Sequence, residues 1–158
     1  MTGAPRFDVL IEDDGWGRHI GDAQAVCEQA LRLTLPQNAD TEVSFLFTSD
    51  EAIRKLNADY RGKDQPTNVL SFPMVQIAAD DPFPPMLGDV IMARQTVQAE
   101  AEQLGITMHD HIMHLLIHGL LHLTGHDHED DDEAEMMEAK ERELLASIGI
   151  ADPYEVTP

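Results

Sequence analysis

The chain has almost no cysteine and no long hydrophobic run. Cys27 is the single cysteine among 158 residues, which excludes an internal disulfide and a cysteine-based metal site. It lies in the apolar pattern of an expected helix, which predicts a buried, unreactive thiol. No apolar stretch approaches the roughly 20 residues that span a bilayer, and the N-terminus lacks the pattern of a signal peptide. These absences predict a cytoplasmic protein that does not contact a membrane.

Positive charge is also scarce. Ten lysines and arginines stand against 30 aspartates and glutamates, which gives a net charge of −20. This balance argues against nonspecific binding to nucleic acid or to an anionic membrane. Four of the basic residues nevertheless fall within ten positions: Arg54, Lys55, Arg61 and Lys63. An anionic substrate is therefore still possible, provided that it meets this local patch.

The hydrophobic pattern predicts both strands and helices. Alternating apolar residues predict strands at 7–13, 41–49, 69–72 and 87–93. Helical spacing predicts helices at 18–35, 95–104, 108–124 and 129–148, and a Thr48/Glu51 capping box predicts a short helix that ends at Leu56. The order lacks strict βαβ regularity. We therefore expect one α+β domain over 1–158, with a small mixed sheet, about five helices, and flexible ends at 1–6 and 150–158.

The segment HGLLHLTGHDH, residues 118–128, carries the strongest chemical signal. His118 and His122 are four residues apart, so their imidazoles share one face of the helix at 108–124. Gly125 can end that helix in the left-handed conformation, and His128 can then return towards the pair. Three imidazoles with a fourth position open are typical of a catalytic zinc site. The sequence predicts one Zn²⁺ on a buried helix.

Neighbouring residues offer alternatives and support. His126 lies two residues from His128 and can replace it as the third ligand. His114, four residues before His118, and Asp127, beside a ligand, are candidates for orienting an imidazole through its second nitrogen.

One mismatch separates this segment from the metallopeptidases. In their HExxH motif the second residue is the glutamate that acts as general base, whereas here it is Gly119. The missing carboxylate argues against peptide hydrolysis. Zinc can lower the pKa of a bound water to roughly 7, so a dedicated base is not needed. Gly119 also allows another backbone or a substrate to approach the helix closely.

HGLLHLTGHDH resembles the HGxLHLxGYDH signature of the bacterial YbeY family of rRNA-maturation endoribonucleases. LNADYRGKDQPTNVLSFP at 56–73 and LGDVIMA at 87–93 resemble two further blocks of that family. The resemblance implies a metal-dependent, single-strand-acting endoribonuclease of 16S rRNA 3′-end maturation and ribosome quality control. It places the zinc ligands on His118, His122 and His128 and a functional arginine on Arg61. This chain departs from the family pattern at two positions: His126 stands where the family has a tyrosine, and Asn68 stands where the family more often has an aspartate.

The residue chemistry agrees with this resemblance. We expect Arg61 in a glycine-containing polar loop, where its guanidinium can bind a phosphate bidentately and stabilise charge in a phosphoryl transition state. Lys63 can bind the same substrate electrostatically. Expected partners are single-stranded or precursor rRNA and, by resemblance, the ribosome or small-subunit proteins. Two alternatives stay open: a metallohydrolase of peptides or small phosphoesters, and a non-catalytic ribosome-biogenesis factor with a structural metal, which the net charge favours.

Overall fold

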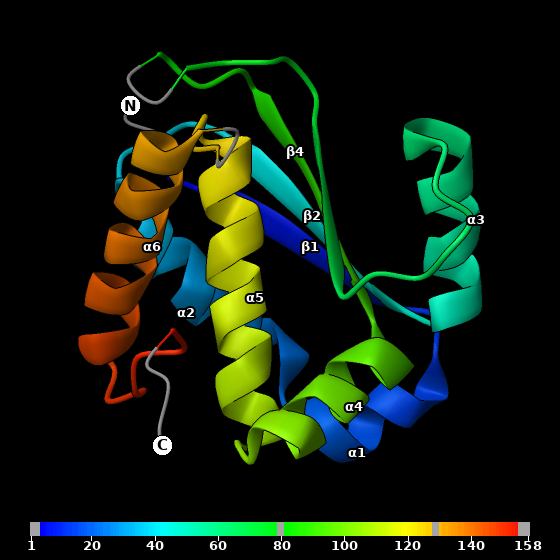
Figure 1. Ribbon diagram of the computed structural model, residues 1–158. Helices are drawn as coiled ribbons and strands as arrows, with labels where there is room; N and C mark the ends of the chain where they lie inside the picture. Colours follow the sequence, from blue (N-terminus) through cyan, green and yellow to red (C-terminus); the bar gives the residue numbers. More distant parts are fainter. Residues whose placement is uncertain (1–3, 79–80, 128–129, 155–158) are drawn as a thin grey trace.

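A computed structural model describes residues 4–78, 81–127 and 130–154. Within these ranges six α-helices pack on a four-stranded mixed sheet, which confirms the α+β prediction (Figure 1). The strands are β1 (Arg6–Ile11), β2 (Glu42–Thr48), β3 (Val69–Pro73) and β4 (Met86–Ala93). After the 3₁₀ turn η1 (Asp14–Trp16), the helices are α1 (Gly17–Ile20), α2 (Ala23–Thr34), α3 (Asp50–Arg61), α4 (Arg94–Leu104), α5 (Met108–Leu123) and α6 (Asp131–Ala146).

The sheet has the order β1-β2-β4-β3. β1, β2 and β4 run parallel, and β3 is antiparallel to β4. Pairing places Phe45 of β2 between Val9 of β1 and Val90 of β4. β3 is thus an edge strand. The polar segment at 60–68 approaches α5 along the outer side of this strand.

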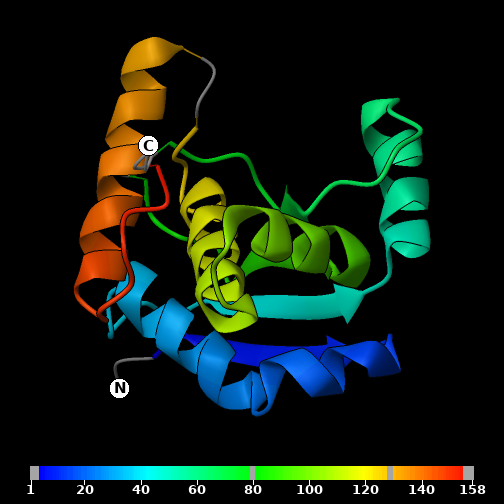
Figure 2. The ribbon, with the colours of Figure 1, turned by 60° about the horizontal axis from the view of Figure 1, so that its bottom comes forward.

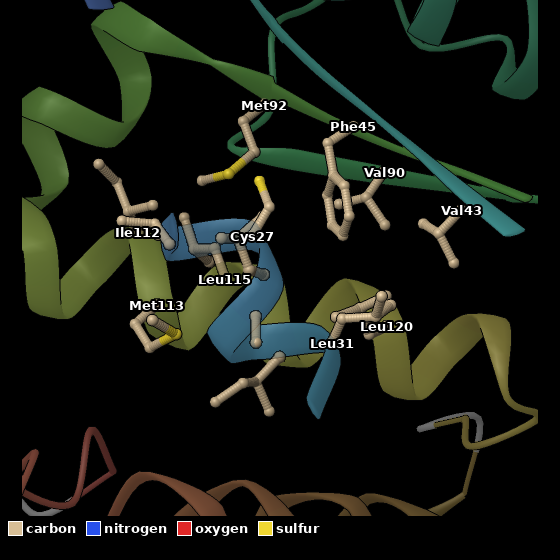
Figure 3. Close-up of a cluster of buried hydrophobic side chains, with 14 of the residues drawn as sticks. Cys27, Leu31, Val43, Phe45, Val90, Met92, Ile112, Met113, Leu115 and Leu120 are labelled. Atoms are coloured by element: carbon tan, nitrogen blue, oxygen red, sulfur yellow. The ribbon is translucent and has the colours of Figure 1, made fainter. Parts of the chain in front are cut away.

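The main core lies between one face of the sheet and the helices α2 and α5. Side chains from the sheet such as Phe45 and Met92 point towards Cys27 of α2 and Leu115 of α5 (Figure 3). Because α5 is covered on nearly all sides, most of its apolar residues are fully buried, as its sequence predicts. The buried position of Cys27 is confirmed, and burial raises the pKa of its thiol to about 12.

The opposite face of the sheet is covered by α3. Ile53 of α3 packs with Leu70, Ile91 and Ala93 in a second, smaller cluster. Figure 2 shows α3 standing apart from α2, α5 and α6. The sheet therefore separates α5 from α3.

Three local predictions are wrong. The helix expected at 18–35 is divided, because Gly21 adopts φ 60° and Asp22 caps a new helix by accepting from the backbone N–H of Ala25. The division gives six helices in the described ranges, in keeping with the expected number of about five. Ser49, rather than Thr48, caps α3, and this helix continues to Arg61 rather than ending at Leu56.

The apolar residues of α6 predict an inner stripe of Met136, Met137, Leu144 and Leu145, of which only Met137 and Leu145 are buried. Met136 is 67% exposed, although its apolar character suggested a core position. The buried stripe is Met137, Glu141 and Leu145, which follow one another at four-residue spacing. No helix in the described residues has the length and apolar content needed to cross a membrane.

Candidate active site

A cleft of about 730 Å³ runs along the edge strand β3, between the C-terminal ends of α3 and α5. His118 and His122 of α5 line one wall. Arg61 of α3 and Lys63 of the following loop line the other. Two sequence motifs that lie about 60 residues apart therefore meet in one cavity, as the functional prediction requires.

The two imidazoles converge on a single point. Nε2 of His118 lies 3.1 Å from Nε2 of His122, and the ring planes are close to perpendicular at 83°. Two nitrogens bound at about 2.0–2.1 Å to one tetrahedral zinc are about 3.3–3.4 Å apart. The pair is therefore spaced as two ligands of one ion.

The helix end explains why His122 points in this direction. Gly125 has φ 100°, and the N–H of His126 donates to the carbonyl of Leu121, which ends α5 and reverses the chain. The backbone carbonyl of His126 then lies 3.1 Å from Nδ1 of His122. A carbonyl only accepts hydrogen bonds, so Nδ1 carries the proton and Nε2 keeps its lone pair. The predicted role of Gly125 as a helix stop is confirmed.

Glu141 of α6 orients the imidazole of His118. Its Oε1 accepts from Nδ1 of His118 at 3.2 Å and from Nε2 of His114 at 2.8 Å. Burial raises the pKa of Glu141, but the hydrogen bonds from the two histidines outweigh it and lower the pKa to about 2. The carboxylate thus favours the His118 tautomer that carries its proton on Nδ1 and its lone pair on Nε2.

The sequence interpretation did not identify Glu141. The available signal was a carboxylate in the middle of the Met137–Leu145 stripe, because an inward-facing glutamate needs a partner. Tyr154 was also missed, since the C-terminal segment was expected to be flexible. Its hydroxyl donates to Glu141 at 3.0 Å, and the Arg142 guanidinium lies 5.4 Å from the centre of its ring. The expected flexibility of 1–6 and 150–158 stays a prediction.

The donor chemistry of the cleft fits a zinc ion as far as it is described. His118 and His122 present two oriented nitrogens, whereas His128, the expected third ligand, lies outside the described residues. In the described ranges alone, no group of three or more potential ligands is assembled. His126 and Asp127 line the same cleft. Their roles as alternative ligand and orienting carboxylate stay predictions.

Gly119 brings α5 close to the sheet. A Cβ at this position would lie 2.9 Å from Cγ1 of Val90 and 3.1 Å from the hydroxyl oxygen of Ser71. The Ser71 hydroxyl donates to the Gly119 carbonyl at 3.0 Å. The predicted close backbone approach is confirmed, and it gives the physical reason for the missing glutamate: a carboxylate side chain here would collide with β4.

Arg61 lies in the last turn of α3, which corrects the predicted loop position. The loop begins at Gly62, which adopts φ 69° and closes the helix. It is tied back by two bonds from Arg54 to Asp64, at 2.7 and 3.3 Å, and by the Asn57 amide, which donates to the Gln65 carbonyl.

The two cations that line the cleft, Arg61 and Lys63, differ from Arg54 in their ion pairing. In the part of the chain that the structure describes, Arg61 and Lys63 form no ion pair, whereas Arg54 is paired with Asp64. Both cations are exposed. In a chain with a net charge of −20, two cations that pair with no described carboxylate and that line the same cleft as two imidazoles make the local charge favourable for an anion.

Asn68 has a structural role at the base of this cleft. Its amide donates to both carboxylate oxygens of Glu100, at 3.0 and 3.3 Å, and Glu100 also contacts Nε2 of His111 at 2.8 Å. An aspartate at position 68 would place two carboxylates against each other. The neutral amide removes that repulsion.

Comparison with known proteins gives a consistent result. A family model described as Endoribonuclease YbeY matches residues 14–149. Proteins named Endoribonuclease YbeY from Azorhizobium caulinodans and Allorhizobium ampelinum are 50% and 53% identical over 153 and 159 residues. The alignments cover 94% and 92% of this chain, and 95% and 92% of those proteins.

A solved structure has a similar fold. The solution structure of TM1509 from Thermotoga maritima superposes with a TM-score of 0.55 at 24% identity. The match covers 95% of this chain and 99% of that protein.

Proposed function

Because this chain belongs to the YbeY endoribonuclease family, we propose that it is a zinc-dependent endoribonuclease that cuts single-stranded RNA. We place it in the maturation of the 16S rRNA 3′ end and in ribosome quality control, in the cytoplasm. One observation carries the proposal. The paired Nε2 atoms of His118 and His122 line the same cleft as Arg61, which forms no ion pair with a described residue.

The residues divide into a metal-holding set and a substrate-holding set. His118, His122 and His128 would hold the ion, with Glu141 and the His126 carbonyl fixing the first two rings. Bound there, zinc supplies Lewis-acid polarisation of a phosphoryl oxygen and lowers the pKa of a water.

The substrate-holding set acts on the phosphate. The planar guanidinium of Arg61 binds two phosphate oxygens and stabilises the charge that develops on them in the transition state. Lys63 adds a second positive charge in the same wall of the cleft. Neither side chain must first break an ion pair among the described residues, so both are available to RNA.

The acidity of the chain defines how it meets its substrate. A net charge of −20 repels bulk RNA, so affinity must come from the cleft or from a bound partner. We propose that a basic protein of the small ribosomal subunit supplies part of that affinity. The same acidity favours a second candidate, a non-catalytic ribosome-biogenesis factor with a structural metal.

Incubation of the purified, zinc-loaded protein with single-stranded RNA and with precursor rRNA tests the proposal. We expect cutting that a chelator stops and added zinc restores. His122→Ala should abolish both cutting and zinc binding. His109→Ala, an exposed histidine on the same helix, should change neither. Zinc binding without any chelator-sensitive cut, on either RNA, would favour the non-catalytic candidate.

A further inference from the structure

One large aromatic side chain is left exposed in the cleft. Tyr60 precedes Arg61 in the last turn of α3, lines the cleft and is 70% exposed. The chain has only two tyrosines and eight aromatic residues in all. Because most of its surface is exposed, this ring contributes little to the core and is accessible from the cleft.

The ring of Tyr60 is fixed from below by the sheet. Its centre lies 5.3 Å from that of Phe72 of β3, at an interplanar angle of 62°, which is an edge contact rather than a stack. The turn that carries Tyr60 is anchored by the buried side chains of Ile53 and Asn57. The ring is therefore positioned while most of its surface stays open to a ligand.

The position of the Tyr60 ring relative to the edge strand β3 indicates the route that a bound RNA strand would take. Ser71 points towards α5, where its hydroxyl meets the Gly119 carbonyl, and the next residue, Phe72, points to the α3 side. Tyr60 and Phe72 thus lie on the α3 side of β3, and His118 and His122 lie on the α5 side. A bound strand that contacts both would cross the edge of β3.

We propose that Tyr60, supported by Phe72, is the stacking platform for one nucleobase of the bound RNA. Arg61 and Lys63 hold the neighbouring phosphates. An aromatic face beside cations is the combination by which proteins hold single-stranded nucleic acids. This inference rests on the proposed function and adds a base-binding subsite to it. Because every base has a π-face, the platform selects unpaired RNA without selecting its sequence.

The platform is tested by measuring how a short single-stranded RNA binds to the zinc-loaded protein. Fluorescence anisotropy measures this binding at low temperature, before the RNA is cut. Loss of one base–aromatic stack should raise Kd by roughly 5- to 150-fold in Tyr60→Leu. Tyr60→Phe should keep the wild-type Kd. Zinc content should stay the same in both variants. Leu10→Ala is a matched control, because Leu10 is an apolar residue that is 56% exposed outside the cleft.

Tyr60→Trp gives a direct spectroscopic readout. The chain's own Trp16 is fully buried, so it contributes a nearly constant background. We expect the RNA to quench the new indole, and an oligonucleotide with abasic sites to quench it far less. An unchanged Kd in Tyr60→Leu, equal quenching by abasic RNA, or no binding of RNA to the wild-type chain would overturn the platform. Loss of chelator-sensitive cutting, by contrast, bears on the proposed function alone.

Discussion

Helices α5 and α3 bring the two halves of the cleft to the same edge strand, but they are held in different ways. α5 buries ten of its 16 residues, between α2, α6 and the sheet. α3 buries only Ile53 and Asn57 and covers the opposite face of the sheet with a small cluster. The histidines therefore belong to the most tightly packed helix, and the cations end a lightly packed one.

This difference matches the roles proposed for the two halves. Metal ligands must be held to within a fraction of an ångström, which demands packed surroundings and hydrogen-bonded rings. Long cationic side chains can reach a polymer from a less constrained base. We therefore expect changes on α5 and its neighbour α6 to alter the metal and the stability, and changes on α3 to alter RNA handling alone.

The sharpest test of this division is Arg61→Ala. Removing one preorganised donor to a developing charge should lower kcat for RNA cutting about 100- to 1,000-fold. Zinc content and thermal unfolding should stay at wild-type values, because Arg61 makes no ion pair with a described residue. Steady-state cutting and metal analysis measure both. Arg18→Ala removes an exposed cation outside the cleft and serves as the control. Loss of zinc in Arg61→Ala would break the comparison.

On the α5 side, Glu141→Gln should weaken zinc binding. Gln cannot offer the charged acceptor that orients Nδ1 of His118, and such changes typically cost about 10- to 100-fold in metal affinity. Competition with a chromophoric chelator measures this loss. Glu143→Gln, an exposed neighbour on the same helix, should leave the affinity unchanged. An unaltered zinc Kd in Glu141→Gln would remove the carboxylate from the site.

Gly119→Ala tests the packing of α5 without touching a ligand. The new methyl group would press on Val90, and this overpacking destabilises the fold. The higher helix propensity of alanine offsets part of the loss, so we expect the free energy of unfolding to fall by about 1–2 kcal/mol. Gly17→Ala is the matched control, because nothing lies within 4 Å of its added carbon. In urea unfolding, the midpoint of Gly119→Ala should therefore lie below that of Gly17→Ala. A Gly119→Ala protein as stable as wild type would show that α5 tolerates displacement.

The smallest expected effect is a pH dependence of stability. The pKa of Glu141 is lowered from 4.5 to about 2 on folding, since the hydrogen bonds from His114 and His118 outweigh burial. Its contribution is therefore complete above about pH 4.5 and is lost as the pH falls towards about 2. In zinc-free protein, the urea midpoint of wild type should fall more over this range than that of Glu141→Gln. Parallel curves for the two proteins would contradict this linkage.

Local sequence signals predicted much of this arrangement. The strands, the buried α5, the His118/His122 pair and the stop at Gly125 follow from periodicity and from one glycine. The reach of α3 to Arg61 was underestimated, because polar residues near a helix end read as a loop.

The features of the site that the sequence did not predict depend on contacts between distant segments. Glu141 and Tyr154 meet the histidines only once α6 and the C-terminal segment pack against α5, and no local pattern specifies that pairing. The break at Gly21 is by contrast a local feature, because Asp22 caps a new helix by accepting from the backbone N–H of Ala25, three residues along the chain.

The most direct test of the account is a crystal structure of the zinc-soaked protein with anomalous scattering from the metal. We expect one zinc peak bound to Nε2 of His118 and Nε2 of His122, a third bond from His128, and a fourth position that faces Arg61. A zinc ion bound elsewhere, or one enclosed by four protein ligands, would contradict the catalytic site proposed for this cleft.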